Sequence, residues 1–132
     1  MKIQLESGGG LNVIRAYTAG QVTVNQAVYV RSVVVTPERI VPDWPPMRFE
    51  DLDAVHFELV AALQPEIVLL GTGSRLRFPE ASRTFALVRA GIGLEVMDTA
   101  AACRTYNVLV ADGRRVAAAL LMIEAAQAES TE

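Results

Sequence analysis

The sequence predicts an α/β fold, a three-layer domain with a central mixed sheet, in which an N-terminal β meander precedes a β-α-β-α-β core. The first half is rich in β-branched residues, and the second half alternates short apolar runs with helical periodicity. A length of 132 residues suits one domain, and 52% hydrophobic with 20% charged residues is typical of a globular one. We expect one domain over 1–132, made of a flexible lead-in (1–10), the meander (11–41), the α/β core (49–123) and a polar tail (124–132).

The first half has the composition of antiparallel strands joined by tight turns. Valines alternate with polar neighbours early in this region, and a longer concentration of β-branched and aromatic residues follows. The strands expected are residues 13–17, 22–24, 27–36 and 39–41, with turns at 19–20 and 25–26. Prolines at positions 42, 45 and 46 then end the β region.

The second half alternates helices and strands. Apolar residues recur at spacings of three and four from Phe49 to Leu63, which indicates an amphipathic helix. Pro79 suits the first position of another helix, and Asp98 or Thr99 suits the cap of a third. The elements expected are a helix at 49–63, a strand at 66–70, a helix at 79–90, a strand at 94–97 and a helix from 98 or 99 to 110.

Residues 115–123 are ambiguous between a helix and a fully buried strand. Their three alanines favour a helix, whereas the branched apolar residues among them suit a buried strand. The β-α-β-α order of the preceding residues favours a strand. Strands and helices in this order imply right-handed crossovers and parallel neighbouring strands.

Charge, cysteine content and hydropathy limit the classes of function. The 12 Lys and Arg against 15 Asp and Glu leave a net charge of -3, which argues against a broad nucleic-acid-binding surface. The single cysteine, Cys103, excludes an internal disulfide framework and a thiolate-rich metal site. Residues 1–10 lack the apolar core of a signal peptide, and the apolar run at 116–123 is too short to cross a bilayer of about 30 Å. We expect a soluble cytoplasmic protein with no membrane insertion, metal or cofactor.

Two runs in the second half resemble a known family. Residues 67–79 read IVLLGTGSRLRFP, and residues 91–121 read GIGLEVMDTAAACRTYNVLVADGRRVAAALL. Both are similar to a widespread family of small bacterial, archaeal and mitochondrial domains of unknown function, whose mitochondrial branch is an assembly factor for respiratory complex I. The resemblance covers roughly residues 33–121. It implies a three-layer α/β fold with a central mixed sheet and supplies no catalytic residues to transfer.

The carboxyl ends of the two predicted parallel strands form one natural crevice. Open α/β sheets bind ligands at this edge, and glycines or a helix N-terminus offer backbone N–H groups to an anion. The candidate residues are Gly71, Thr72, Gly73, Ser74, Arg75, Arg77, Asp98, Arg104 and Asn107. The arginines would bind phosphate or carboxylate, Asp98 would act as a base in an enzyme, and Asn107 would bond the Gly71–Ser74 backbone. The alternative is a tight turn, a helix cap and solvated arginines, because the pattern lacks the elements of a phosphate-binding motif.

Other residue types give weaker candidates. Cys103 stands beside an arginine near a helix start, which could make it reactive, but its spacing favours burial as a small apolar residue. His56 lies within an apolar helical stripe, without the partners of a zinc site. Glu50, Asp51 and Asp53 complement a helix N-terminus. We therefore expect no catalytic residue and no metal site, although an enzyme in the crevice stays an alternative.

The segment Trp44–Phe49, WPPMRF, is a candidate surface for a partner protein. Trp, Met, Arg and Phe are enriched at interfaces, and the prolines would stiffen the loop. The contact residues expected are Trp44, Met47 and Phe49, unless the loop folds Trp44 onto its own sheet.

The leading hypothesis is a non-catalytic domain that binds a protein partner, as an assembly or maturation factor. Its contact surface would combine the Trp44–Phe49 loop with residues 71–77. The alternative is a domain, or an enzyme, that holds a small anionic ligand in the crevice. The sequence leaves the oligomeric state open.

Overall fold

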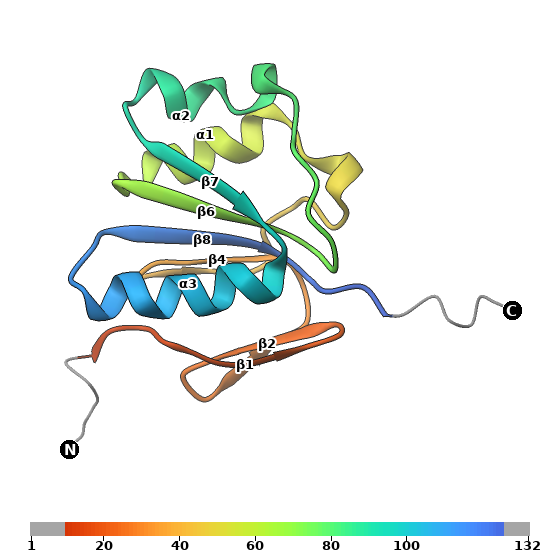
Figure 1. Ribbon diagram of the computed structural model, residues 1–132, viewed down its shortest axis with the longest axis vertical. Helices are drawn as coiled ribbons and strands as arrows, with labels where there is room; N and C mark the ends of the chain where they lie inside the picture. The colour runs from red at the N-terminus through yellow and green to blue at the C-terminus, as the bar shows by residue number, and fades with distance from the viewer. Residues whose placement is uncertain (1–9, 126–132) are drawn as a thin grey trace, which may run out of the picture.

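A five-stranded mixed sheet lies at the centre of the fold (Figure 1). The structure is a computed structural model that describes residues 10–125. Most of the predicted lead-in and tail, residues 1–9 and 126–132, lies outside the described residues. The strands are β1 (Ile14–Thr18), β2 (Gln21–Val24), β3 (Ala27–Tyr29), β4 (Val33–Val35), β5 (Ile40–Val41), β6 (Ile67–Thr72), β7 (Gly93–Met97) and β8 (Val116–Leu121). The helices are α1 (Ala54–Ala62), α2 (Phe85–Arg89) and α3 (Thr99–Ala111), with single 3-10 turns at η2 (Phe49–Asp51) and η3 (Ala81–Arg83).

The central sheet has the strand order β5-β4-β8-β6-β7. β8 pairs in parallel with β6 and antiparallel with β4, so the ambiguous residues 115–123 contain a strand, as the β-α-β-α order predicts. Every residue of β8 is buried, because both faces of the sheet are covered. Its alanines leave room for the helices that pack over it. The predicted α/β class with a central mixed sheet is confirmed.

Two apolar cores lie on opposite faces of this sheet. On one face, α1 and α2 bury Phe57, Val60 and Leu87 together with Trp44. On the other face lie α3 and a separate three-stranded sheet, β1-β2-β3, and Tyr106 of α3 is buried among them. Figure 1 shows the resulting layers, with α1 and α2 above the central sheet and α3 and the small sheet below it.

The predicted meander is divided between two sheets. The strand expected over 27–36 is two strands: β3 pairs with β2, whereas β4 pairs with β5 and β8. The chain leaves the small sheet at residues 30–32, where the Ser32 carbonyl accepts the Trp44 N–H at 2.9 Å. The β-branched composition is the same on both sides of this break, so composition predicts strands without showing which sheet they join.

Two predicted helices are shorter than expected. The helix predicted from residue 49 begins at Ala54, because the Asp53 carboxylate accepts the Ala54 N–H at 2.8 Å and the His56 ring nitrogen Nδ1 accepts the Asp53 N–H at 3.0 Å. Residues 49–51 form the turn η2 instead. The helix predicted over 79–90 is reduced to η3 and the five residues of α2. The cap at Asp53 therefore sets the start of α1, whereas neither η3 nor α2 begins with a side-chain cap.

Candidate functional site

The carboxyl ends of β6 and β7 lie side by side, as predicted, and the loop after β6 is held by Thr72. Its buried hydroxyl donates to the Arg75 carbonyl at 2.7 Å and accepts the Arg77 N–H at 3.3 Å. The strand also runs two residues further than expected, through Gly71 and Thr72. The loop of residues 73–77 is therefore fixed by backbone and hydroxyl contacts.

Thr99, the first residue of α3, fills the floor of the crevice. Its hydroxyl donates to the Leu121 carbonyl at 2.7 Å and accepts the Gly73 N–H at 2.8 Å, and its own N–H donates to the Gly73 carbonyl at 2.9 Å. A Cβ on Gly71 would lie 2.9 Å from the Thr99 hydroxyl oxygen and 3.0 Å from its Cα. The glycine therefore lets α3 approach the strand, and the space predicted for a ligand holds protein atoms.

A carboxylate of the chain itself occupies the predicted anion position. The Ser74 N–H donates to Glu124 Oε1 at 2.6 Å, and Arg77 Nη2 lies 3.4 Å from Glu124 Oε2. Burial acts to raise the pKa of Glu124, but the Ser74 hydrogen bonds and the Arg77 charge outweigh it and leave this pKa below its ordinary value. The loop thus recognises a carboxylate, and Glu124 supplies it.

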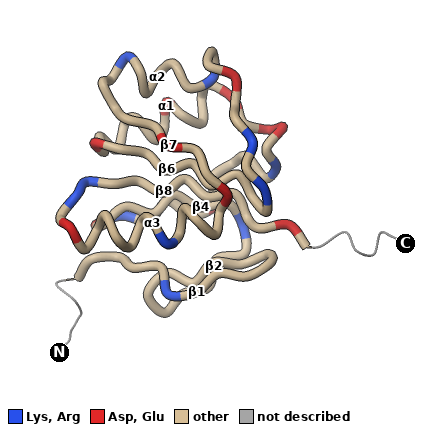
Figure 2. The backbone as a smooth tube through the Cα atoms, in the orientation of Figure 1, with Lys and Arg blue, Asp and Glu red and all other residues tan. Residues whose placement is uncertain are grey.

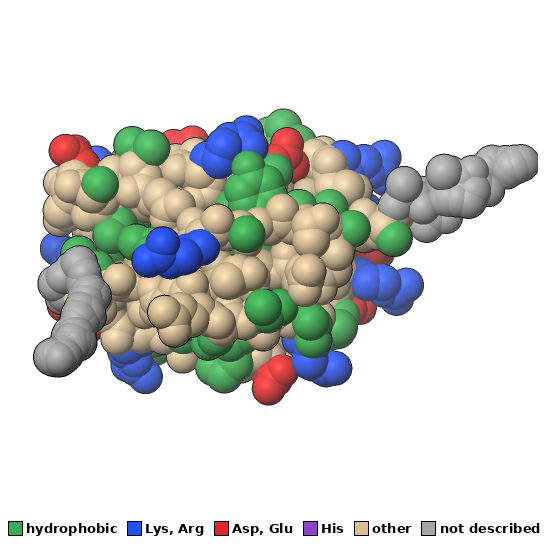
Figure 3. All heavy atoms as spheres, turned by 90° about the horizontal axis from the view of Figure 1, so that it is seen from below, with side chains coloured by type: hydrophobic (Ala, Val, Ile, Leu, Met, Phe, Trp, Pro, Cys, Tyr) green, Lys and Arg blue, Asp and Glu red, His purple; other side chains and the backbone are tan. Residues whose placement is uncertain are grey.

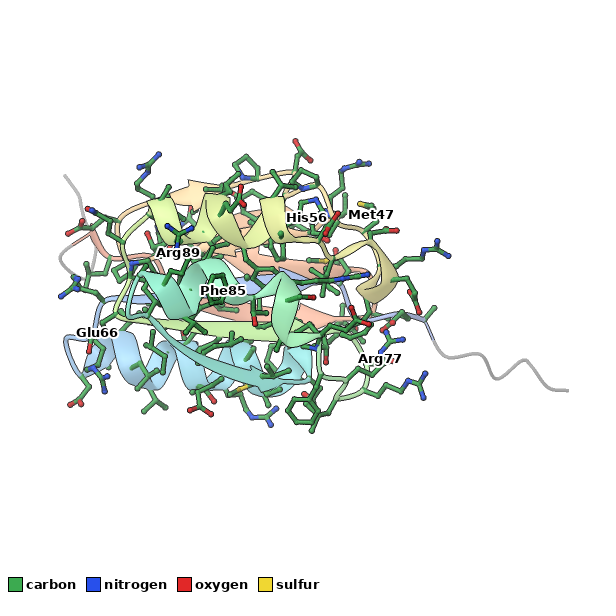
Figure 4. All side chains as sticks on the ribbon, turned by 90° about the horizontal axis from the view of Figure 1, so that it is seen from above. Met47, His56, Glu66, Arg77, Phe85 and Arg89 are labelled. Atoms are coloured by element: carbon green, nitrogen blue, oxygen red, sulfur yellow. The ribbon has the colours of Figure 1, made fainter. Side chains whose placement is uncertain are left out.

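Arg77 joins this crevice to a neighbouring groove. Its guanidinium lies 4.7 Å over the Phe49 ring and 3.3 Å from the Glu50 carboxylate, and its buried Nε has no partner among the described residues. Figure 4 shows Arg77 at the carboxyl-end edge of the sheet, to one side of the helices. The groove has a volume of about 560 Å³ and is lined by Phe49, Glu50, Leu52, Arg77, Phe78, Pro79, Glu80 and Arg83. Its lining includes both acidic and basic residues, and Figure 2 shows such positions interspersed along the backbone.

Four predicted crevice residues have other roles or stand apart. Arg75 is exposed, and Asp98 caps α3 by accepting the Ala101 N–H at 2.8 Å. Arg104 donates to the Tyr17 hydroxyl at 2.9 Å, which places it beside β1. The side-chain amide of Asn107 bonds the N–H and the carbonyl of Ile14 at 2.9 and 2.7 Å, so it holds β1 against α3 and does not bond residues 71–74.

Two residues of the crevice escape sequence reasoning. The sequence indicates a helix cap at Asp98 or Thr99, whereas the role of Thr99 in the crevice depends on the close packing of α3 against Gly71. Glu124 belongs to the segment expected to be a polar tail, and nothing in the local sequence shows that it reaches Ser74, fifty residues away. The bridge between Ile123 and Ala19 holds this segment in place.

The remaining reactive groups are engaged in structural contacts. Cys103 is buried, and burial raises the pKa of its thiol to about 12, so it is protonated at neutral pH. His56 caps α1, and its ring lies edge-on to Trp44 at 6.2 Å between centroids. Within residues 10–125 the structure shows no group of three or more His, Cys, Asp or Glu placed to hold a metal ion.

The structure corrects the expected contact surface at Trp44. This side chain is 1% exposed, packs against Phe57, and donates its indole N–H to the His56 carbonyl at 3.4 Å. Of the other two residues, Met47 is 44% exposed and Phe49 is half-buried beneath Arg77. Trp44 is a core residue because the loop folds onto the sheet, the alternative stated for this segment.

Comparison with known proteins finds a family and several relatives. Residues 14–121 match the family model described as "Protein of unknown function (DUF498/DUF598)". The 13 kDa major membrane protein of Francisella tularensis is 26% identical over 110 residues, which cover 81% of this chain and 88% of the relative. The human protein named NADH dehydrogenase (ubiquinone) 1 alpha subcomplex assembly factor 3 is 32% identical over 110 residues, 82% of this chain and 59% of that protein. The chain thus spans about three-fifths of the assembly factor.

A solved structure shares the fold. The solution structure of a Bordetella pertussis protein, a Mth938-like domain, superposes with a TM-score of 0.80 at 30% identity and covers 100% of this chain and 99% of its own. Between residues 10 and 125, no helix has the length and apolar composition needed to cross a membrane. Because one relative is named a membrane protein, a cytoplasmic location stays a prediction.

Proposed function

The chain belongs to the DUF498 family of proteins of unknown function, and we propose that it works by binding partner proteins rather than by catalysis. Relatives named as NADH dehydrogenase assembly factors support a role in the assembly or maturation of a larger complex, here in the cytoplasm. The extension from those relatives to this chain is by analogy.

The observation that carries this proposal is the exposed apolar side chain of Phe78 in the lining of the Arg77 groove. Phe78 is 70% exposed, Leu76 of the same loop 49% and Met47, which precedes η2, 44%, and we call these three residues the loop surface. An exposed aromatic side chain in the wall of a groove is typical of protein interaction sites. The hydrogen bonds of Thr72 hold the backbone of this loop, so a partner would meet a pre-ordered surface.

The chemistry of the crevice agrees with a binding role. The hydroxyls of Thr72 and Thr99 are both committed to backbone groups, and Cys103 carries a buried, protonated thiol. The carboxylate of Asp98, the candidate base, accepts a hydrogen bond from the N-terminus of α3. These side chains stabilise the loop and the start of α3. A rigid loop of this kind is what a surface that binds a partner protein requires.

The test is a tagged pull-down from the native cell, with soluble and membrane fractions kept apart. Phe78→Asp should reduce capture of the partner by roughly 30-fold, the effect expected when a hot-spot side chain is lost. Val108→Asp, at an exposed position of α3, is the control and should capture the same partner as the wild type. Equal capture by both variants, or no specific partner for the wild type, would contradict the proposal.

A second candidate function rests on the Glu124 contact. Because the Ser74 N–H and Arg77 hold a carboxylate, the same groups would bind a small carboxylate or phosphate if Glu124 were displaced. Glu124→Ala empties the position, and citrate or inorganic phosphate at about 100 times its dissociation constant should then stabilise the fold by roughly 2.7 kcal/mol. A thermal shift that is absent, or that persists in Glu124→Ala/Arg77→Ala, would rule this function out.

A further inference from the structure

The two helices that cover one face of the central sheet turn apolar side chains outward as well as inward. The exposed positions, which we call the helix face, are Val55, Glu58, Leu59 and Ala62 on α1 and Phe85, Val88 and Arg89 on α2. The exposed fractions of Val55, Leu59, Phe85 and Val88 are 60%, 37%, 56% and 67%. Inward positions of the same helices, such as Phe57 and Leu87, are buried in the core.

The helix face is unusual for the outer layer of an α/β fold. A helix that covers a sheet normally presents polar residues to water, whereas a helix that is apolar all round is normally buried. The spacing 55, 58, 59, 62 is a single helical stripe, and 85, 88, 89 is another. Because α1 packs against α2, the two stripes form one surface. Figure 4 looks onto this surface and shows Phe85 and Arg89 on α2, next to α1.

The charges on the helix face suit a second copy of the chain. The surface carries one acid, Glu58, on α1 and one base, Arg89, on α2, and neither is in an ion pair within the described part of the chain. A two-fold axis that lies in the plane of the surface and runs between the two helices would set α1 of one copy on α2 of the other, so that Glu58 of each copy faces the helix that carries Arg89 in its partner. Apolar side chains would then meet apolar side chains between the two ion pairs.

We propose that the chain forms a two-fold dimer through the helix face, with a second copy of itself as the partner. This inference goes beyond the proposed function, because it uses α1 and α2 rather than the loop that carries Leu76 and Phe78. The face of the small sheet contrasts with it, since apolar side chains there are interspersed with charged ones (Figure 3). An unpartnered apolar face with matched opposite charges is self-complementary, which an isologous interface requires.

The first test measures self-association by sedimentation equilibrium of the full chain. The wild type should have a mass of about twice 14.3 kDa, with dissociation only on dilution. Val88→Asp should weaken dimerisation by roughly 30-fold, as expected for a residue central to an interface. Val108→Asp is the matched control, because Val108 is a helical valine that is 66% exposed, against 67% for Val88. A wild type that stays monomeric at millimolar concentration, or equal effects of the two variants, would overturn the proposal.

The second test uses charge exchange and does not depend on the stability of any one variant. Glu58→Arg alone and Arg89→Glu alone each place like charges together twice, so each should be monomeric. An equimolar mixture of the two restores both ion pairs and should form a heterodimer, as should the double variant with itself. Monomers in the mixture would overturn the assigned pairing. Phe78→Asp should remain dimeric, so loss of partner capture and loss of the dimer are separable results.

Discussion

Replacing Gly71 with alanine would add one methyl group where α3 lies closest to β6. The new Cβ would stand 2.9 Å from the Thr99 hydroxyl oxygen, 3.0 Å from the Thr99 Cα and 3.0 Å from Leu120. The hydroxyl bonds Gly73 and Leu121, so Thr99 cannot retreat without losing these contacts. Because one of the close atoms is backbone, the start of α3 must shift as a unit.

The expected change in the free energy of unfolding combines two destabilising contributions with one stabilising contribution. Overpacking a well-filled site costs about 1–3 kcal/mol, and a neutral hydrogen bond of the Thr99 type is worth about 1 kcal/mol. Replacing glycine also lowers the entropy of the unfolded chain, which returns about 0.4–1 kcal/mol. We therefore expect Gly71→Ala to lower the free energy of unfolding by about 1–2 kcal/mol.

Urea unfolding followed by circular dichroism measures this change as a lower midpoint at unchanged slope. Gly93→Ala is the matched control: Gly93 also lies in a parallel strand without a positive φ, but its Cβ would meet nothing closer than 3.7 Å. We expect Gly93→Ala to be as stable as the wild type or slightly more stable. If the two variants shift the midpoint alike, the close approach of Thr99 does not determine the need for glycine.

Three further predictions concern single side chains. Gln64 has a left-handed backbone with φ 60 directly after α1, so Gln64→Gly should raise the free energy of unfolding by about 0.5–1 kcal/mol, and a lower urea midpoint would contradict this. Glu124→Gln should cost about 1 kcal/mol near neutral pH, a value reduced for the exposure of the carboxylate. Because the pKa of Glu124 is below its ordinary value of 4.5 in the fold, that stabilisation is complete above pH 4.5 and lost as the pH falls through the lowered pKa, so thermal melts of variant and wild type should converge in acid. A difference that stays constant with pH would refute the role of the charge. Cys103, with a pKa of about 12 through burial, should react with iodoacetamide far more slowly in the native protein than in urea, and equal rates would show that it is accessible.

The sequence predicts most of the helices and strands, because caps, turns and hydrophobic periodicity depend on residues close together in the chain. Asp98 caps α3 as expected, and the alternation of elements places a parallel strand at 116–121 despite its alanines. The same order predicts that the loop after β6 and the start of α3 meet at one edge, and the structure shows that they do. The organisation as one domain over 1–132 stays a prediction.

Features that depend on distant contacts were predicted less well. Asn107 is expected to bond the backbone of residues 71–74, yet its partner is Ile14, ninety-three residues away. Trp44 has the composition of an interface residue and is a core residue, because the loop folds back onto α1. The strand expected at 27–36 is two strands in different sheets, and the chain passes from one sheet to the other at Arg31 and Ser32, between two stretches that both contain β-branched residues.

Local patterns are enough to predict the fold class, the order of the elements and the edge at which the candidate site lies, since periodicity, caps and crossover handedness act within a few residues or between neighbouring elements. What occupies that edge depends on contacts between residues far apart in the chain. Glu124 and Thr99 reach the loop because β8 and α3 pack beside β6, and this packing closes an anion position that the local sequence leaves open. The tertiary structure likewise shows which apolar residues of α1 and α2 are buried in the core and which are exposed to solvent.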